Sequence, residues 1–334
     1  MDFEPDDLYS RTVCLPSGKY IVLSHIIFTP TGQTVTIPEL LATQLVAELE
    51  SCFKRRSMLF VPLNKPQYRD KIFAGEIPAD GFIWDLEDSV PVHEKEDARR
   101  QISNLPAKPR GIEHIIRINT GEPDELEKDL AAITSFPFDT INLAKVESAA
   151  MIEEIKSHMG DEYGYLATVE TLSGLKHLDE ICSVLRAEKD ALGFGIGDMT
   201  VQLGIERIPS HKSALIQQIL GQFSVAGMLH GLDLLDAVST RISDLDVFRQ
   251  EALLAKNIFG FTGKKLVHPA QVAVANEVFL PTIESVEQDI ATIKSFTGDR
   301  KSNARMVNGE YRGLPALNRA FKNLRSHARH GYLA

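Results

Sequence analysis

The sequence predicts an α/β protein built on a (β/α)8 TIM barrel, with an N-terminal extension and a C-terminal helical tail. From Ser57 onward, short apolar segments rich in β-forming residues alternate with amphipathic helical segments. This alternation is typical of a parallel sheet covered by helices. Eight such units at spacings of roughly 25–35 residues fit a closed barrel better than an open sheet. The absence of a GxGxxG motif between the first strand and helix argues against a dinucleotide-binding fold.

The barrel is expected over residues 55–281. Its predicted strands are 57–62 (SMLFVP), 81–86 (GFIWDL), 114–119 (HIIRIN), 140–145 (TINLAK), 163–170 (YGYLATVE), 191–197 (ALGFGIG), 232–238 (LDLLDAV) and 264–269 (KKLVHP). Helices expected between them include 93–105, 124–136, 148–159 and 246–259. The Gly-rich block GFGIG is expected within and at the end of the sixth strand.

Segments on both sides of the barrel lack a chemical signature. The N-terminal extension, 1–54, contains a predicted strand at 19–28 and a predicted amphipathic helix at 38–53, which has Pro38 near its start. The C-terminal segment, 282–334, is expected to contain a helix, a polar loop and a basic helix, at 285–297, 298–313 and 315–330. We expect this tail to pack on the barrel or to reach a neighbouring subunit.

Composition limits the classes of partner. The net charge of -10 disfavours binding to nucleic acid or to an anionic membrane, although a local field can still attract an anionic substrate. The three cysteines, Cys14, Cys52 and Cys182, lack metal-ligand spacing and fit a reducing cytoplasm. The acidic N-terminus does not resemble a signal peptide, and no apolar run approaches the roughly 20 residues that span a bilayer. We therefore expect a cytoplasmic protein that binds neither nucleic acid nor membrane.

Charged and polar side chains occur at the C-terminal ends of most predicted strands. A barrel gathers these ends around one mouth, where the active sites of such enzymes lie. A buried charge costs several kcal/mol unless it is paired or bound to a metal, so the shared location is informative. The side chains are Asp85, Glu87 and Asp88 after the second strand, Arg117 and Asn119 after the third, Lys145 and Glu147 after the fourth, Glu170 after the fifth, Asp198 after the sixth, and His268 after the eighth.

These residue types suit one kind of chemistry. Several carboxylates without His or Cys clusters favour Mg²⁺, or Mn²⁺ in its place, over Zn²⁺. Arg117 is suited to hold a substrate carboxylate through two hydrogen bonds. A 2-oxo acid held between a metal and an arginine can make or break a carbon–carbon bond beside its carbonyl.

Seven motifs resemble those of the HpcH/HpaI aldolase and citrate lyase beta-subunit family, in order and spacing from about residue 55 to 281. They are RRSMLFVP (55–62), DLEDSV (85–90), RIN (117–119), KVES (145–148), VET (169–171), GIGDMTVQLG (195–204) and KKLVHPAQV (264–272). The resemblance implies a phosphoenolpyruvate/pyruvate-binding barrel with Mg²⁺-dependent lyase or aldolase activity. It also implies a 2-oxo acid or acyl-thioester substrate and a homotrimer or homohexamer.

The resemblance also implies roles for individual residues. Glu170 and Asp198 would be the direct metal ligands, and with Arg117, which binds the substrate, they would be the catalytic residues. The supporting residues would be Asp85, Glu87 and Asp88 around metal-bound waters, Arg56 near the substrate, and Lys145 and His268 lining the mouth.

The residues themselves leave simpler interpretations open. Glu170 and Arg117 would also fit ion pairs in a barrel mouth, and Asp198 would fit a helix N-cap. Structural roles also remain open for Lys145 as an ion-pair partner, His268 as a turn residue, Arg56 as part of a solvated basic pair, and Asp85, Glu87 and Asp88 as residues at a helix start.

Four departures from the family pattern bear on the substrate. Ser173 stands where a basic residue is common, Gly197 stands where the pattern G-x-E-D has an acid, and Leu63–Asn64 replaces glycine-serine. In thioester lyases of the family, a C-terminal aspartate enters a neighbouring active site as the acid/base. Gly313 stands in its place here, which counts against a CoA thioester substrate.

Three functions therefore remain open. The first is a Mg²⁺-dependent carbon–carbon lyase or aldolase of the citrate lyase beta-subunit type. The second is hydrolysis of a malyl-type thioester at the same site. The third is a specialised, non-catalytic subunit of a multi-protein system, in which 1–54 and the basic tail would be docking surfaces.

Overall fold

A computed structural model describes residues 12–14, 20–22, 25–28, 33–36, 53–108, 111–187, 189–297 and 304–330. The chain divides into two compact units. One is Arg55–Phe279, and the other combines Met1–Lys54 with Leu280–Ala334. In the described part of the chain, no helix has both the length and the apolar character needed to cross a membrane.

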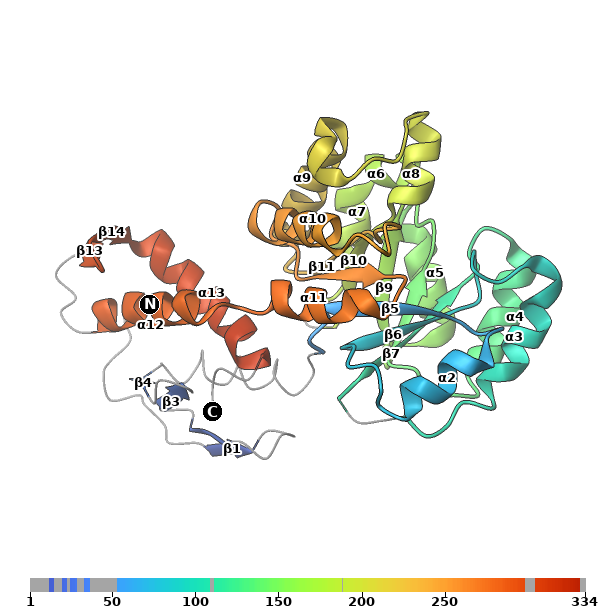
Figure 1. The fold of residues 1–334 in the computed structure, drawn as a ribbon, viewed down its shortest axis with the longest axis horizontal. Coiled ribbons are helices and arrows are strands. Elements are labelled where there is room, and N and C mark those ends of the chain that lie inside the picture. The colour runs from blue at the N-terminus through green and yellow to red at the C-terminus, as the bar shows by residue number, and fades with distance from the viewer. Residues whose placement is uncertain are drawn as a thin grey trace. The chain divides into compact units, whose positions relative to one another are not determined.

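The Arg55–Phe279 unit is a closed barrel of eight parallel strands surrounded by helices (Figure 1). Around the barrel the strands follow the chain order from β5 to β12, and β12 pairs with β5 to close the ring. The strands are β5 Ser57–Pro62, β6 Gly81–Asp85, β7 Glu113–Ile118, β8 Thr140–Leu143, β9 Gly164–Val169, β10 Ala191–Phe194, β11 Asp233–Asp236 and β12 Gly263–Leu266. The TIM-barrel prediction is confirmed.

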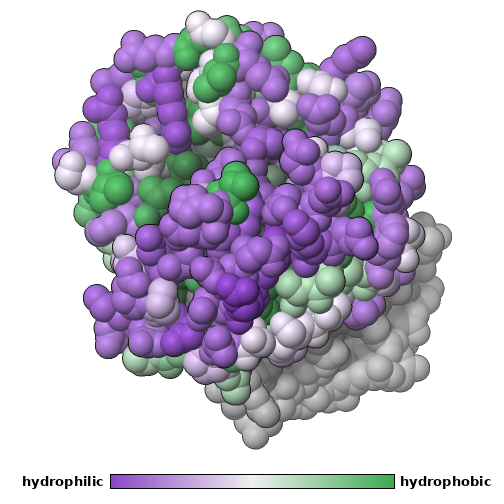
Figure 2. All heavy atoms as spheres, turned by 90° about the vertical axis from the view of Figure 1, so that its right-hand side faces the viewer, coloured by the Kyte–Doolittle hydropathy of each residue, from purple (hydrophilic) through white to green (hydrophobic). Residues whose placement is uncertain are grey.

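Helices follow the strands and cover the outside of the barrel. Ser148, Ser213 and Asp244 each cap the helix that follows them by accepting a hydrogen bond from a backbone N–H of its first turn. The helices are α2 Pro66–Phe73, α3 Lys95–Ile102, α4 Pro123–Ile133, α5 Ala149–Met159, α6 Leu172–Lys176, α7 Leu178–Ser183, α8 Ile196–Leu203, α9 Ala214–Leu229, α10 Leu245–Asn257 and α11 Ala270–Phe279, with 3-10 turns at Val92–Glu94 and Ser210–Lys212. The face around α2, α3 and α4 is mostly hydrophilic, as expected of amphipathic helices packed on a sheet (Figure 2).

The Gly-rich block at 193–197 is only partly strand. β10 ends at Phe194, Gly195 is the N-cap, and α8 begins at Ile196. The sixth strand is therefore shorter than the predicted 191–197. As a consequence Asp198 belongs to the first turn of a helix and lies directly above the strand end.

The barrel interior has an apolar floor, to which six of the strands contribute: Met58, Ile83, Ile115, Leu166, Ala191 and Leu235, with Phe60 packed against them. Side chains alternate between the two faces of a strand, so every second residue after this floor also points inward. Two steps beyond Ile115 is Arg117, and four steps beyond Leu166 is Glu170. This alternation therefore places Arg117 and Glu170 inside the barrel at its C-terminal end.

The second unit contains a four-stranded antiparallel sheet in the order β1-β2-β3-β4. Its strands are β1 Thr12–Cys14, β2 Tyr20–Val22, β3 His25–Phe28 and β4 Gln33–Thr36. The single strand predicted over 19–28 is wrong, because β2 and β3 pair antiparallel with Val22 opposite His25. The helix predicted over 38–53 lies, apart from Phe53, outside the described residues.

The C-terminal part of this unit contains α12 Ile283–Thr297 and α13 Leu314–Arg329, which are joined by hydrogen bonds from His327 and Asn323 to Asp289. The polar loop predicted over 298–313 is corrected in its described part. β13 Ala304–Val307 and β14 Glu310–Gly313 form a hairpin there. Its turn residues, Asn308 and Gly309, both have positive φ, as a tight hairpin turn requires.

Candidate active site

Glu170 lies at the C-terminal end of β9 and is 6% exposed. Its Oε1 accepts a hydrogen bond of 2.9 Å from the backbone N–H of Lys145, a residue with a φ of 50°. A Cβ atom at Gly195 would overlap the Glu170 side chain, so the backbone of the next strand end reaches the carboxylate only because residue 195 is glycine. Burial raises the pKa of Glu170, against the attraction of Lys265 and Arg117. The carboxylate is therefore held in a fixed place where a neighbouring cation would be favourable.

Asp198 approaches Glu170 from the next strand end, and its negative charge contributes to the raised pKa of Glu170. Its Oδ2 is 3.6 Å from Lys145 Nζ and, among the described residues, is a buried oxygen without a hydrogen-bond partner. The N-cap of α8 is Gly195, so Asp198 does not cap that helix with its side chain.

The residues around these two carboxylates fit a divalent cation with oxygen ligands. The described residues contain no group of three or more His, Cys, Asp and Glu side chains placed to bind a metal. Two carboxylates that leave the remaining positions to water and substrate are the usual arrangement for Mg²⁺. The Oδ2 of Asp198 accepts no hydrogen bond from the described residues, and its one nearby protein cation is Lys145 Nζ at 3.6 Å.

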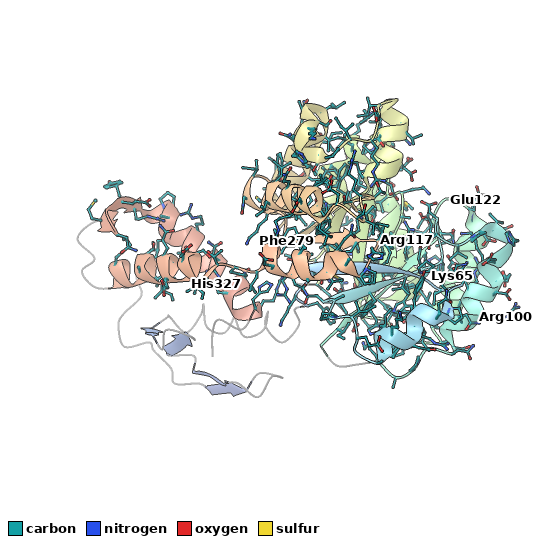
Figure 3. The ribbon with its side chains drawn as sticks, viewed as in Figure 1. Lys65, Arg100, Arg117, Glu122, Phe279 and His327 are labelled. Atoms are coloured by element: carbon teal, nitrogen blue, oxygen red, sulfur yellow. The ribbon has the colours of Figure 1, made fainter. Side chains whose placement is uncertain are left out.

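Arg117, which is labelled in Figure 3, is held by acids at the mouth of the barrel. Its Nε and Nη2 donate to the two carboxylate oxygens of Asp85 at 2.7 and 2.6 Å, and its Nη1 lies 3.1 Å from Glu87 Oε2. The guanidinium also lies 4.7 Å from the centre of the Phe60 ring. Burial alone would raise the pKa of Asp85, but the charge and hydrogen bonds of Arg117 lower it. Arg117 is thus oriented by a buried ion pair with Asp85.

Lys145 connects the acids of two strand ends. Its Nζ forms an ion pair with Glu87 and lies 3.2 Å from Asp88 Oδ1. Burial would lower the pKa of Lys145, but Glu87 and Asp88 raise it, so the amine stays protonated. Burial raises the pKa of Glu87 to about 7, against the attraction of Arg117. A protonated Lys145 is unsuited to Schiff-base formation and is suited to hold negative charge.

The structure does not place Arg56 with the other predicted site residues. Arg56 precedes β5, and its Nε and Nη2 each bind Asp80 at 2.8 Å, at the N-terminal end of the barrel. The predicted contact of Arg56 with the substrate is therefore wrong, because the mouth lies at the opposite ends of the strands.

His268 follows β12 at the mouth end but is exposed, and its Nδ1 accepts a hydrogen bond from Ala270 N–H. Of the other residues at these strand ends, Glu147 is exposed and Asn119 binds Asp129.

Sequence reasoning missed Lys265, which is 3% exposed and lies inside the barrel. Its Nζ is 3.5 Å from Thr168 Oγ1, and a Cβ atom at Gly193 would lie 3.3 Å from it. Burial lowers the pKa of Lys265 to about 8, against the attraction of Glu170. The alternation of side chains along the strand could have predicted this position, because it points Lys265 into the barrel and Lys264 out of it. Lys264 forms an ion pair with Asp236 there.

The buried amine of Lys265 predicts pH-dependent stability. Its pKa is about 8 in the folded chain, whereas that of an exposed lysine is roughly 10.4. Between these values the unfolded chain binds more protons, so raising the pH stabilises the folded state. Lys265→Met removes this cost, and we expect it to raise the free energy of unfolding at pH 7 by at most about 3 kcal/mol. Urea unfolding at pH 7 and pH 10 should show the gain shrinking as the pH rises.

Lys71→Met is the matched control, because Lys71 is an exposed lysine on α2. Its effect on unfolding should be small and independent of pH. A Lys265→Met protein whose stability differs from that of the parent by the same amount at both pH values would contradict the prediction.

Comparisons with known proteins agree with the fold and with the strand-end motifs. Residues 56–269 match the family model for HpcH/HpaI aldolase/citrate lyase. The chain is 30% identical over 284 residues to the citrate lyase subunit beta of Leuconostoc mesenteroides subsp. cremoris, covering 80% of this chain and 91% of that protein. It is 32% identical over 243 residues to a (3S)-malyl-CoA thioesterase of Cereibacter sphaeroides, covering 72% of this chain and 82% of that protein.

A solved structure is also similar. The CitE protein of Mycobacterium tuberculosis, in complex with magnesium, acetoacetate and coenzyme A, has a TM-score of 0.67 and 26% sequence identity. The similarity covers 82% of this chain and 97% of that one. A citrate lyase beta subunit of the same organism with oxaloacetate and magnesium has a TM-score of 0.59 and 28% identity, and CitE with magnesium and pyruvate has a TM-score of 0.60 and 27% identity.

Proposed function

Because this chain belongs to the HpcH/HpaI aldolase/citrate lyase family, we propose that it is a Mg²⁺-dependent carbon–carbon lyase or aldolase acting on a 2-oxo acid or a 3-hydroxyacyl thioester. The observation that carries the proposal is the pair of carboxylates, Glu170 and Asp198, at neighbouring strand ends with Arg117 and Lys145 beside them. Mn²⁺ is the alternative cation, since it also takes oxygen ligands.

Each residue has a role that follows from its contacts. Glu170 and Asp198 would hold the cation, and Arg117 would bind the substrate carboxylate with the N–H donors that Asp85 and Glu87 leave free. Asp85, Glu87 and Asp88 would hold metal-bound waters and keep Arg117 and Lys145 in place. His268 would line the outer mouth. The chemistry that a bound Mg²⁺ supplies here is polarisation of the carbonyl and stabilisation of developing negative charge.

The protonated amine of Lys145 adds a second source of positive charge beside the carboxylates. It lies within reach of Glu87, Asp88 and Asp198, so it offsets the repulsion between acids of neighbouring strand ends. Such a fixed positive group also stabilises charge that develops on a substrate oxygen during bond cleavage.

A hydrolase acting on a malyl-type thioester is the second candidate. The 32% identity to a (3S)-malyl-CoA thioesterase favours it. Gly313, which stands in place of the aspartate that thioester lyases of this family use, counts against a lyase acting on a CoA thioester.

Product analysis separates the two candidates. The purified chain should be incubated with Mg²⁺ and (3S)-malyl-CoA, and the products identified by mass spectrometry. Carbon–carbon cleavage gives glyoxylate and acetyl-CoA, whereas hydrolysis gives malate and free coenzyme A. A parallel incubation with oxaloacetate tests the 2-oxo acid substrate without a thioester. Failure of Mg²⁺ to affect any turnover would contradict the proposal.

Absence of turnover on every substrate, together with intact Mg²⁺ and oxo acid binding, would support the third candidate, a non-catalytic subunit.

We also propose that the chain assembles as a homotrimer or homohexamer. Light scattering coupled to size-exclusion chromatography tests the assembly, and a monomer at micromolar concentration would contradict it.

A further inference from the structure

Arg207 lies at the mouth of the barrel outside the network of Arg117. It belongs to the segment that joins α8 to α9, and it is half-buried. Its Nη2 donates a 2.7 Å hydrogen bond to the carbonyl of Val238, two residues beyond the end of β11. This bond fixes the guanidinium above the strand ends, between the start of α8 and the segment that follows β11.

Arg207 forms no ion pair with an acid of the described residues. Its hydrogen bond to Val238 uses one of five N–H donors. Burial lowers the pKa of Arg207, and the more distant charge of Glu251 offsets this only in part. Glu251 itself accepts a 3.3 Å hydrogen bond from Ser210 N–H. A partly buried arginine that no carboxylate contacts directly is costly unless a ligand supplies an anion.

Gly197 leaves open space in front of this guanidinium. A Cβ atom at residue 197 would have Arg207 Nη1 as its single neighbour within 4 Å, at 3.9 Å. An acidic side chain at this position would therefore reach Arg207 and neutralise it, and glycine leaves the arginine available. Gly197 and Asp198 both belong to the first turn of α8, which follows β10. The space therefore lies at the same strand end as Asp198.

From this geometry we propose that Arg207 and Gly197 form an anion subsite that binds a second carboxylate of the substrate. The inference rests on the proposed function, because it places the oxo acid end of the substrate at Glu170 and Asp198. The substrate is then a dicarboxylate, whose first carboxylate meets Arg117 and whose second meets Arg207. Arg117 belongs to β7 and Arg207 is bound to the segment after β11, so two arginines at different strands of the barrel would select substrates with two negative ends.

Oxaloacetate and pyruvate are the matched probes, because they differ by one carboxylate. Their affinities should be measured by calorimetry with saturating Mg²⁺, using fresh oxaloacetate at low temperature, for the wild-type protein and for Arg207→Gln. We expect the wild-type protein to prefer oxaloacetate and Arg207→Gln to reduce this preference by about 10- to 100-fold, as expected for a hydrogen bond to a charged group.

Substitutions at Gly197 test whether the open space in front of Arg207 is needed for the oxaloacetate preference. Gly197→Glu places a carboxylate in front of Arg207 and should reduce the oxaloacetate preference, whereas Gly197→Gln fills the same space without charge and should reduce it less. Arg241→Gln, which changes an exposed arginine in the segment after β11, is the control and should leave the preference unchanged.

The possible outcomes distinguish a failure of the proposed function from a failure of the anion subsite at Arg207. If the wild-type protein binds neither oxo acid with Mg²⁺, the proposed function fails and this inference fails with it. If it binds both, but Arg207→Gln keeps the oxaloacetate preference, the inference alone is overturned. A third measurement uses coenzyme A as the ligand. Weaker coenzyme A binding by Arg207→Gln, with the preference unchanged, would assign Arg207 to a phosphate group and overturn the dicarboxylate assignment.

Discussion

Replacing Glu170 with glutamine or Asp198 with asparagine should abolish tight Mg²⁺ binding and turnover while the barrel remains folded. Each change keeps the size of the side chain but removes one of two negatively charged oxygen ligands. We expect the affinity for Mg²⁺ to fall by more than about 100-fold, which exceeds the roughly 10- to 100-fold typical of changes to groups that only support the ligands. Calorimetric titration with Mg²⁺ measures the affinity, and circular dichroism checks the fold.

Without metal, Glu170→Gln should not lower the stability of the folded chain. Burial raises the pKa of Glu170, so the ionised carboxylate is unfavourable in the metal-free chain. A neutral glutamine avoids this cost, and the variant should be no less stable than the parent without metal. Added Mg²⁺ should stabilise the parent to thermal unfolding but not the variant, because only the parent binds it.

Glu147→Gln is the control for both variants. Glu147 is an exposed acid at the end of β8, so it shares the mouth with Glu170 without sharing its burial. Mg²⁺ affinity should be unchanged in this variant. Unchanged affinity in both Glu170→Gln and Asp198→Asn would contradict the assignment of the metal ligands.

The fold could be predicted because the strands are short apolar runs with distinct helical segments between them. The predicted strand 57–62 coincides with β5, and the others differ from the observed strands by a few residues at their ends. Boundaries were wrong where backbone geometry decides them. Gly195 ends β10 and caps α8, and the hairpin turn at Asn308–Gly309 lies in a segment predicted as a loop. In the second case the Asn-Gly pair was a usable hairpin signal.

The candidate site was less predictable than the fold. Strand ends identify residues at the mouth, but they give no distances between side chains. Arg56 was misplaced because it stands before its strand, at the end of the barrel opposite the mouth. Lys265 was missed because it lies in mid-strand, and Arg207 because it lies in a connection without a motif. The structure shows Lys265 by its burial inside the barrel, and Arg207 by the lack of an ion pair with any acid of the described residues.

Replacing Arg117 with methionine should destabilise the folded barrel strongly. Asp85 is fully buried, and Arg117 supplies both hydrogen bonds of its bidentate ion pair. Removing one partner of a buried ion pair leaves an uncompensated charge and costs about 3–5 kcal/mol. Urea unfolding should show this loss in the free energy of unfolding, and the affinity for pyruvate should fall as well, since the same guanidinium is proposed to bind the substrate.

A double-mutant cycle separates the two roles of Arg117. Adding Asp85→Asn to Arg117→Met removes the unpaired charge, so stability should recover in part, because replacing a whole buried pair costs far less than breaking it. Pyruvate affinity should stay low in the double variant if Arg117 contacts the substrate. Recovery of pyruvate affinity together with stability would mean that Arg117 acts only through folding. Arg56→Met, which breaks the ion pair with Asp80 at the opposite end of the barrel, should lower stability and leave pyruvate affinity unchanged.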